Sequence, residues 1–458
     1  YATVKGLLLS LLRQCGCVVL LGNTFHLLLR PGPEVVRDLG GLHAMMGWQG
    51  PILTDSGGYQ AYSMADTNAI DEDGVSFKSI VDGSTIRMTP ESSMQIQNAL
   101  GADIIMAFDD CPPSVDPNAG PTNQTRIKLA ALRDSEKGAY DHSARVRTSN
   151  ERTVRWLERC NAAHGHADRQ ALFGIVQGGT DREARAWAAE RSCGIDLPGY
   201  AIGGVAVGEI SADIHRIVEF TAPLLPEAKP RYLMGVGYER DILAAVLSGV
   251  DMFDCVLPTR NGRSATAFTR FGPLRLKNLA HERDRTVIEP GCDCPACDPG
   301  RHGLTTPGGQ GFGRGTIRHL FRAEEMLGPI LVSLHNVRHF QRLMLDIRRA
   351  LRDDDWLAFA RRWPVAIEGI DPALFGRLGI TELASDAHPA PLDDTETNAT
   401  CSSPFKTRSP QCQACQQGRR PSRRSPAIPR QRVIRPRHRP GLPPAASAAS
   451  AFSSRSSA

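Results

Sequence analysis

Short, continuously hydrophobic runs alternate with longer segments in which hydrophobic and polar residues recur at helical spacing over roughly the first 260 residues. Each run ends in polar residues or glycines. Continuous hydrophobic runs are typical of strands buried on both faces, and helical segments between them favour a parallel sheet covered by helices. We predict seven such strands, which end in the segments VVLLGNTFH (18–26), PILTDSGGY (51–59), DIIMAFDDC (103–111), LFGIVQGG (172–179), YAIGGVAVGE (200–209), RYLMGVG (231–237) and MFDCVLPTR (252–260).

Polar groups at the carboxyl ends of parallel strands are typical of an α/β (β/α)8 barrel of the TIM type, which is the predicted fold class. A closed barrel of this type needs eight strands. Because the chain opens on Tyr1 rather than Met, we expect the first strand to precede this sequence. An open, doubly wound parallel sheet is the alternative architecture.

The composition changes at about residue 386, where Pro, Ser, Arg and Ala become dominant. Such a segment cannot bury enough apolar surface to fold, so we predict a disordered tail over residues 386–458, without a metal role for its Cys412 and Cys415. Residues 401–458 hold 12 of the 54 Lys and Arg residues and none of the 49 Asp and Glu residues, so the rest of the chain is net acidic. A surface that binds nucleic acid must therefore be a local basic patch.

The longest apolar runs, GLLLSLL and CVVLLG, are much shorter than the roughly 20 residues that span a bilayer, and Arg13 lies between them. We therefore expect no membrane segment. The 12 cysteines are unevenly placed, with three of them in CDCPAC. This pattern favours a metal site over a disulfide framework and predicts a cytoplasmic protein.

Asp55, Asp109 and Asp254 each follow a predicted strand core, which would bring them to one mouth of a barrel. Any one of them could instead be a helix N-cap, but three together indicate a site. Two carboxylates at one mouth suit displacement at the anomeric carbon of a sugar, where one attacks and the other transfers a proton. The predicted reaction class is glycosyl transfer.

Two glycine clusters, VQGG and IGGVAVG, follow neighbouring strands and would let the backbone approach a flat ligand closely. Tight turns between strand and helix are the alternative explanation. Gln177 lies beside one cluster, with Asp109 on another strand end. A carboxylate and an amide match the pairing edge of guanine, so the set predicts a purine pocket.

Cys292, Cys294 and Cys297 have the spacing of metal ligands and need a fourth ligand to complete a tetrahedral structural zinc site. Spacing alone leaves this ligand open among His302, His319, His335 and His339. We therefore predict a barrel domain over residues 1–280, and a small zinc-binding subdomain with closing helices over residues 281–385.

These motifs, together with HLFRAEEMLG and LHN, resemble the bacterial tRNA-guanine transglycosylases in unbroken order over roughly residues 1–375. The resemblance implies a pentosyltransferase of the queuosine pathway. Such an enzyme replaces the wobble guanine of tRNAs with a GUN anticodon by 7-aminomethyl-7-deazaguanine. The resemblance also implies a homodimer that binds tRNA, the 7-deazaguanine base and one structural Zn²⁺ ion.

The resemblance also implies roles for individual residues. Asp254 is the nucleophile that forms a covalent bond to the ribose, and Asp55 is the general acid and base. The groups that bind the base are Asp109, Gln177, the backbone of Gly204 and Val205, Tyr59 and Met234 on its two faces, Ser56 beside the general base, and Cys111 with Val207 around its aminomethyl group.

On the RNA side, the resemblance assigns Arg260 and Arg263 to the anticodon loop, whose bases must be splayed out for chemistry. Alternatively, Arg260 and Arg263 are exposed residues of a turn without a binding role. His335 is the implied fourth metal ligand. Arg314, Arg318 and Arg322 are expected to be available for tRNA phosphates.

Two segments depart from the family pattern. Ser264, Ala265 and Thr266 replace residues that contact the anticodon, and PGRHGLTTPGGQG is a Gly-rich insertion after Cys297. An inactive fragment and a non-catalytic tRNA-binding subunit are therefore the alternative functions. Retention of both Asp55 and Asp254 argues against the second of these. An archaeal-type enzyme is disfavoured because the chain ends in a predicted disordered tail.

Overall fold

The computed structural model describes residues 1–63, 68–114, 116, 141–207, 209–304 and 310–376. The predicted tail, with Cys412 and Cys415, lies outside the described residues. Each of the seven predicted runs forms a strand of one parallel sheet. The strands are β1 (Leu20–Gly22), β2 (Ile52–Thr54), β6 (Ile104–Met106), β7 (Ala171–Val176), β8 (Gly199–Ile202), β9 (Arg231–Leu233) and β10 (Met252–Phe253).

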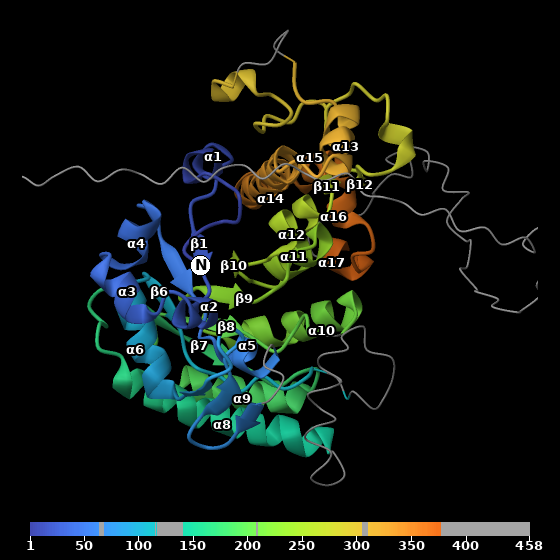
Figure 1. Ribbon diagram of the computed structural model, residues 1–458. Helices are drawn as coiled ribbons and strands as arrows, with labels where there is room; N and C mark the ends of the chain where they lie inside the picture. The colour runs from blue at the N-terminus through green and yellow to red at the C-terminus, as the bar shows by residue number, and fades with distance from the viewer. Residues whose placement is uncertain (64–67, 115, 117–140, 208, 305–309, 377–458) are drawn as a thin grey trace, which may run out of the picture. The chain divides into compact units, whose positions relative to one another are not determined.

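The seven strands follow one another in chain order across the sheet, with β1 and β10 at its edges. A doubly wound sheet requires a reversal of strand order, so that alternative is wrong. The sheet is curled as in an incomplete (β/α)8 barrel, with helices on its outer side (Figure 1). These helices are α3 (Pro33–Asp38), α4 (Gly41–Met46), α6 (Pro90–Leu100), α8 (His142–Ala163), α9 (Arg182–Cys193), α10 (Ser211–Thr221) and α11 (Glu239–Leu247).

Alternate residues of the strands enter two separate hydrophobic cores. Leu53, Met106 and Tyr232 belong to a small cluster, whereas Ile52 and Ile105 belong to the large cluster that also contains residues of the covering helices. Successive side chains of a strand point to opposite faces, so the small cluster fills the inside of the curled sheet. Burial on both faces explains why the strand sequences are continuously hydrophobic.

Two antiparallel units accompany the barrel and were not predicted. One is a three-stranded sheet of β3 (Asn68–Ile70), β4 (Val75–Lys78) and β5 (Thr85–Met88). The other is a hairpin of β11 (Thr266–Thr269) and β12 (Gly272–Arg275). The hairpin contributes Ala265, Ala267 and Leu276 to a hydrophobic core that it shares with the cysteine segment.

The remaining helices include the 27-residue helix α14 (Leu327–Asp353), against which several of the others pack. Within the described residues, no helix combines the length and apolar character needed to cross a membrane. The helices are α1 (Leu9–Gln14), α2 (Thr24–Leu29), α5 (Gly58–Ser63), α12 (Leu257–Arg263), α13 (Arg314–Arg322), α15 (Trp356–Arg362), α16 (Pro364–Ile367) and α17 (Pro372–Gly376).

Candidate active site

Asp55 follows β2 directly and is buried with only 8% of its surface exposed. Its Oδ1 accepts a hydrogen bond from the backbone N–H of Thr24 at 2.7 Å, and its Oδ2 accepts from the side-chain amides of Asn23 and of Gln60, the latter at 3.1 Å. Burial and, after it, the negative charge of Asp254 raise the pKa of Asp55 to about 7, against the lowering effect of the hydrogen bonds from Thr24 and Asn23. Asp55 can therefore both hold and release a proton near neutral pH.

The raised pKa of Asp55 predicts a pH-dependent gain in stability for Asp55→Asn. A carboxyl group with a higher pKa in the folded state retains its proton there, so its ionisation destabilises the fold as pH rises. Folding raises the pKa of Asp55 from 3.8 to about 7. The free energy of unfolding of the wild type should therefore fall as the pH rises from about 4 to 7. The variant has no carboxyl group at this position to titrate. We expect the free energy of unfolding to shift in the variant's favour by up to ~4 kcal/mol over this interval.

Urea unfolding of both proteins at about pH 4.5 and pH 8 measures this shift. A difference in unfolding free energy that is the same at both pH values would contradict the assignment of a buried, proton-retaining Asp55.

Asp109 lies three residues after β6 and is also buried. Its Oδ1 accepts a hydrogen bond from Ser56 Oγ at 3.1 Å and its Oδ2 from Gln177 Nε2 at 2.7 Å. Burial raises the pKa of Asp109 to about 6, opposed by these two hydrogen bonds. The structure thus joins residues from the ends of β2, β6 and β7 in one polar cluster.

Gln177 and Gly204 meet at the back of this cluster. The Oε1 atom of Gln177 is buried and accepts no hydrogen bond from the described residues. Gly204 has a φ of +61°, and a Cβ atom there would lie 2.2 Å from this Oε1. Glycine is therefore required at this position for both its backbone conformation and the space it leaves.

Asp254 follows β10 and is half-buried. Its Oδ1 accepts hydrogen bonds from the Tyr232 hydroxyl at 2.6 Å and from the Gly235 backbone N–H at 2.9 Å. Within the described ranges, no group donates to Oδ2. One carboxylate oxygen of Asp254 is thus held in place by two donors, and the negative charges of Asp254 and Asp109 both contribute to the raised pKa of Asp55.

The other predicted base-binding residues lie on the same strand ends. Tyr59 in α5 and Met234 after β9 are half-buried, and Met234 packs against the core inside the sheet. Ser56, Cys111, Val205 and Val207 are buried.

Sequence reasoning missed the role of Glu209 beside this group. Its carboxylate accepts hydrogen bonds from the backbone N–H groups of Ala206 and Val207 at 2.8 and 2.7 Å and from Ser114 Oγ at 2.8 Å. Ala206 has a φ of +60°, which is unfavourable for a non-glycine residue. Glu209 therefore stabilises the turn that follows Gly204, and its position at the end of a Gly-rich motif was the available signal.

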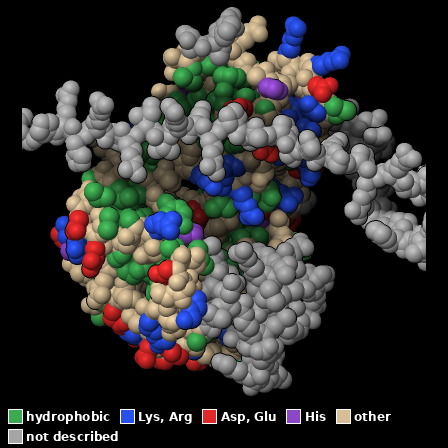
Figure 2. Space-filling model, in the orientation of Figure 1, with side chains coloured by type: hydrophobic (Ala, Val, Ile, Leu, Met, Phe, Trp, Pro, Cys, Tyr) green, Lys and Arg blue, Asp and Glu red, His purple; other side chains and the backbone are tan. Residues whose placement is uncertain are grey.

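Arg260 and Arg263 lie on α12, where Arg260 is exposed and Arg263 half-buried. The helix packs tightly on α14, since a Cβ atom on Gly262 would lie 2.5 Å from Ser333 Oγ. In Figure 2, several Lys and Arg side chains gather on the face where α12 and β10 lie in Figure 1. A cavity of ≈ 450 Å³ beside α12 has a mixed lining, whose polar and basic members are Asn261, Ser264, Thr266, Arg275, Lys277 and Asn278.

Among the three arginines expected to be available for phosphates, only Arg322 is exposed. Arg314 donates to Asp284 at 3.2 Å and to the Ile288 carbonyl at 3.0 Å. Arg318 donates to the Asn278 carbonyl and lies 3.4 Å from Glu282. Both arginines thus connect elements of the small subdomain, which their position on a helix did not reveal.

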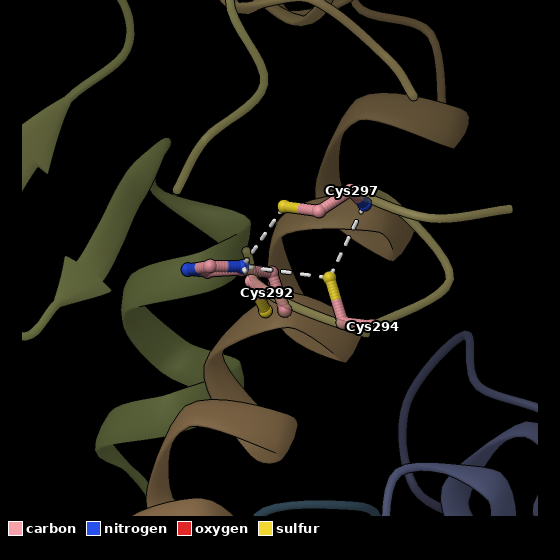
Figure 3. A group of neighbouring side chains, drawn as sticks. Cys292, Cys294 and Cys297 are labelled. Carbon is pink, nitrogen blue, oxygen red and sulfur yellow. Dashed lines mark hydrogen bonds between the residues drawn. The ribbon is translucent and has the colours of Figure 1, made fainter. Parts of the chain in front are cut away.

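A candidate metal centre is formed by Cys292, Cys294, Cys297 and His335, which are all buried. Figure 3 shows the side chains of the three cysteines close together. Their potential ligand atoms lie within 4.8 Å of one another, and His335 Nδ1 lies 3.5 to 3.6 Å from each of the three Sγ atoms. Bonds of about 2.3 Å to sulfur and 2.0 Å to nitrogen at tetrahedral angles require an N···S distance of about 3.5 Å. The residues therefore fit a tetrahedral ion.

The second nitrogen of His335 also fits a metal ligand. Nε2 lies 2.8 Å from the carbonyl oxygen of Phe268, to which it donates a hydrogen bond in the tautomer that leaves Nδ1 free to bind a metal. The alternatives are excluded by their surroundings. His302 contacts the Asp293 carbonyl, His339 pairs with Glu239, and His319 is exposed on α13.

Asn336, the next residue, connects the metal centre to α12. Its side-chain Nδ2 donates to the carbonyls of Pro258 and Thr266, both at 2.9 Å, and its Oδ1 accepts from the Phe268 N–H at 2.9 Å. The sequence motif LHN therefore supplies a candidate metal ligand and hydrogen bonds that hold the helix that bears Arg260. The metal centre lies in a buried core and is suited to a structural role.

Comparisons with known proteins agree with this arrangement. A family model described as queuine tRNA-ribosyltransferase matches residues 1–368. The chain is similar to the queuine tRNA-ribosyltransferase of Thermus thermophilus, with 50% identity over 361 residues that cover 79% of this chain and 84% of the relative. The corresponding protein of Symbiobacterium thermophilum is 46% identical over 366 residues, or 79% and 82% of the two chains. That of Synechococcus elongatus is 44% identical over 362 residues, or 79% and 85%.

Proposed function

This chain belongs to the queuine tRNA-ribosyltransferase family, and we propose that it exchanges the wobble guanine of tRNA through a covalent ribosyl-aspartate intermediate. The family makes it a pentosyltransferase with tRNA-guanine transglycosylase activity. The observation that carries the mechanism is the arrangement of two carboxylates. Asp254 is fixed through one oxygen, and Asp55 has a pKa near 7, which the negative charge of Asp254 helps to raise.

In the first step, Asp254 Oδ2 attacks C1′ of the ribose while the bond between C1′ and N9 of guanine breaks. The departing guanine takes a proton from Asp55. In the second step, N9 of the incoming base attacks C1′, the bond to Asp254 breaks, and Asp55 takes the proton from N9. Splitting the displacement at one carbon into two such steps retains the configuration of the nucleoside.

The base pocket is proposed to read guanine and 7-aminomethyl-7-deazaguanine alike. Asp109 accepts from the two N–H donors of the pairing edge, and the amide of Gln177 and the backbone at Gly204 and Val205 face its carbonyl. The two faces of the base are covered by Tyr59 and Met234, while Ser56, Cys111 and Val207 shape the remaining wall.

The tRNA is proposed to bind with its anticodon loop across α12. Arg260 and Arg263 contact phosphates or bases next to the wobble position, and the exposed Arg260 supports this role. Ser264 and Thr266 line the neighbouring cavity, where they can offer only short polar side chains.

The metal centre is proposed to hold one structural Zn²⁺ ion on Cys292, Cys294, Cys297 and His335. The ion supplies no chemistry to the exchange, but it neutralises the buried thiolates and fixes the segment on which α12 and the hairpin rest. A cytoplasmic homodimer, as the family resemblance implies, completes the proposal.

The test is incorporation of labelled guanine into unmodified tRNA that carries a wobble guanine, followed by competition with 7-aminomethyl-7-deazaguanine. We expect label in tRNA with a GUN anticodon and none in the same tRNA with adenine at the wobble position. Binding of tRNA without incorporation would instead favour a non-catalytic subunit, and absence of both would favour an inactive fragment.

A further inference from the structure

Arg185 is a fully buried cation without a carboxylate partner among the described residues. It lies in the first turns of α9, and 0% of its surface is exposed. A guanidinium stays charged in proteins, and burying one without a direct counter-ion costs several kcal/mol. Burial lowers the pKa of Arg185 only to about 10, with the negative charge of Glu209 as the main opposing influence, so the group is a cation at neutral pH. A buried charge kept at this cost requires a structural reason.

All three guanidinium nitrogens donate to backbone carbonyls. Nε donates to Gly179 at 2.9 Å, Nη1 to Val176 at 3.0 Å and Nη2 to Gly204 at 3.2 Å. Val176 and Gly179 flank Gln177 at the end of β7, whereas Gly204 follows β8. The planar guanidinium group of Arg185 thus joins the two neighbouring strand ends that carry the glycine clusters.

These contacts leave little freedom to the Gln177 side chain and the Gly204 backbone, which are the proposed donors to the base carbonyl. A Cβ atom on Gly204 would lie 2.2 Å from Gln177 Oε1 and 3.7 Å from Arg185 Nη2, so the three groups form one packed unit. A Cβ atom on Gly178 would lie 2.8 Å from the backbone nitrogen of Arg185, which places the helix directly behind this turn. Removing the guanidinium group would free both turns at once.

We propose that Arg185 is a positioning residue for base recognition, which fixes Gln177 and the Gly204 turn in the geometry that meets the carbonyl of the purine. This inference rests on the proposed function of the same pocket. A lysine has the charge but cannot reach three carbonyls with one planar fork, so the shape of the guanidinium is part of the role. The residue does not touch the substrate itself.

The experiment compares the wild type with Arg185→Lys and Arg185→Met in guanine exchange. We expect both variants to raise KM for guanine about tenfold, which corresponds to loss of one well-placed hydrogen bond, with KM for tRNA unchanged within about twofold. Arg191→Met on the same helix is the matched control, since Arg191 is exposed over the Trp187 ring and should leave both KM values unchanged.

Competition with 2-aminopurine separates this role from general damage to the pocket. This base keeps the purine faces but has no carbonyl at C6, so we expect its inhibition constant to change less than about twofold in the Arg185 variants. An equal loss for both bases would assign Arg185 to the stability of the pocket as a whole, and an unchanged KM for guanine would exclude any role in recognition. Either result overturns the inference, whereas absence of exchange in the wild type overturns the proposed function.

Discussion

Asp254→Asn is expected to lower guanine exchange by more than about 10³-fold and to abolish the covalent complex with tRNA. An amide is a poor nucleophile towards C1′, and removal of a covalent nucleophile costs factors of this size or greater in enzymes that depend on one. The Tyr232 hydroxyl and the Gly235 N–H can still donate to the amide oxygen that replaces Oδ1. The variant should therefore fold and bind tRNA as the wild type does.

Two measurements check this expectation. Exchange of labelled guanine gives the rate, and denaturing electrophoresis after incubation with tRNA shows whether a covalent complex forms. Asp196→Asn is the matched control, because the Asp196 side chain is 97% exposed and, among the residues that the structure describes, forms an ion pair with Lys229 alone. A variant at position 254 that exchanges guanine at the wild-type rate would refute the assignment of the nucleophile and leave Asp55 as the remaining candidate.

The sheet could be predicted from the sequence because both of its faces are buried. Each strand therefore had to be continuously hydrophobic, and its end was marked by the first polar residue or glycine. The same reasoning brought Asp55, Asp109 and Asp254 to one end, since the carboxyl ends of parallel strands meet there. The three-stranded antiparallel sheet was missed although the turn DEDG, in which Asp71 accepts from the Gly74 N–H, was a hairpin signal.

The contacts that tune the site could not be predicted, because they join residues far apart in the chain. Tyr232 reaches Asp254 across neighbouring strands, and Gln177 reaches Asp109 across 68 positions. The choice of His335 among four histidines likewise depended on which face of α14 meets the cysteine segment. Spacing along the chain gives the chemical type of a group, whereas its hydrogen-bond partners depend on packing.

Loss of the metal centre is expected to have the largest effect on stability. In Cys294→Ala, a tetrahedral ion would lose one of four ligands inside a core where Cys294 is fully buried. Binding of a structural zinc ion is coupled to folding and contributes on the order of 10 kcal/mol in small zinc domains, so loss of roughly half of this would exceed the stability margin of many proteins. The expected result is a lower melting temperature and less than one bound Zn²⁺ per chain.

Thermal unfolding and metal analysis of the variant and of chelator-treated wild type measure this effect. Cys193→Ala is the matched control, since Cys193 is a half-buried free cysteine on α9 outside the metal cluster, and it should keep its zinc and nearly all of its stability. An unchanged melting curve in Cys294→Ala would contradict a structural metal.

Because Asn336 follows His335 and holds Pro258 and Thr266, loss of zinc should also weaken tRNA binding through α12 before it affects the carboxylates. A chelated enzyme that unfolds only in part should therefore show a raised KM for tRNA while its KM for guanine is unchanged.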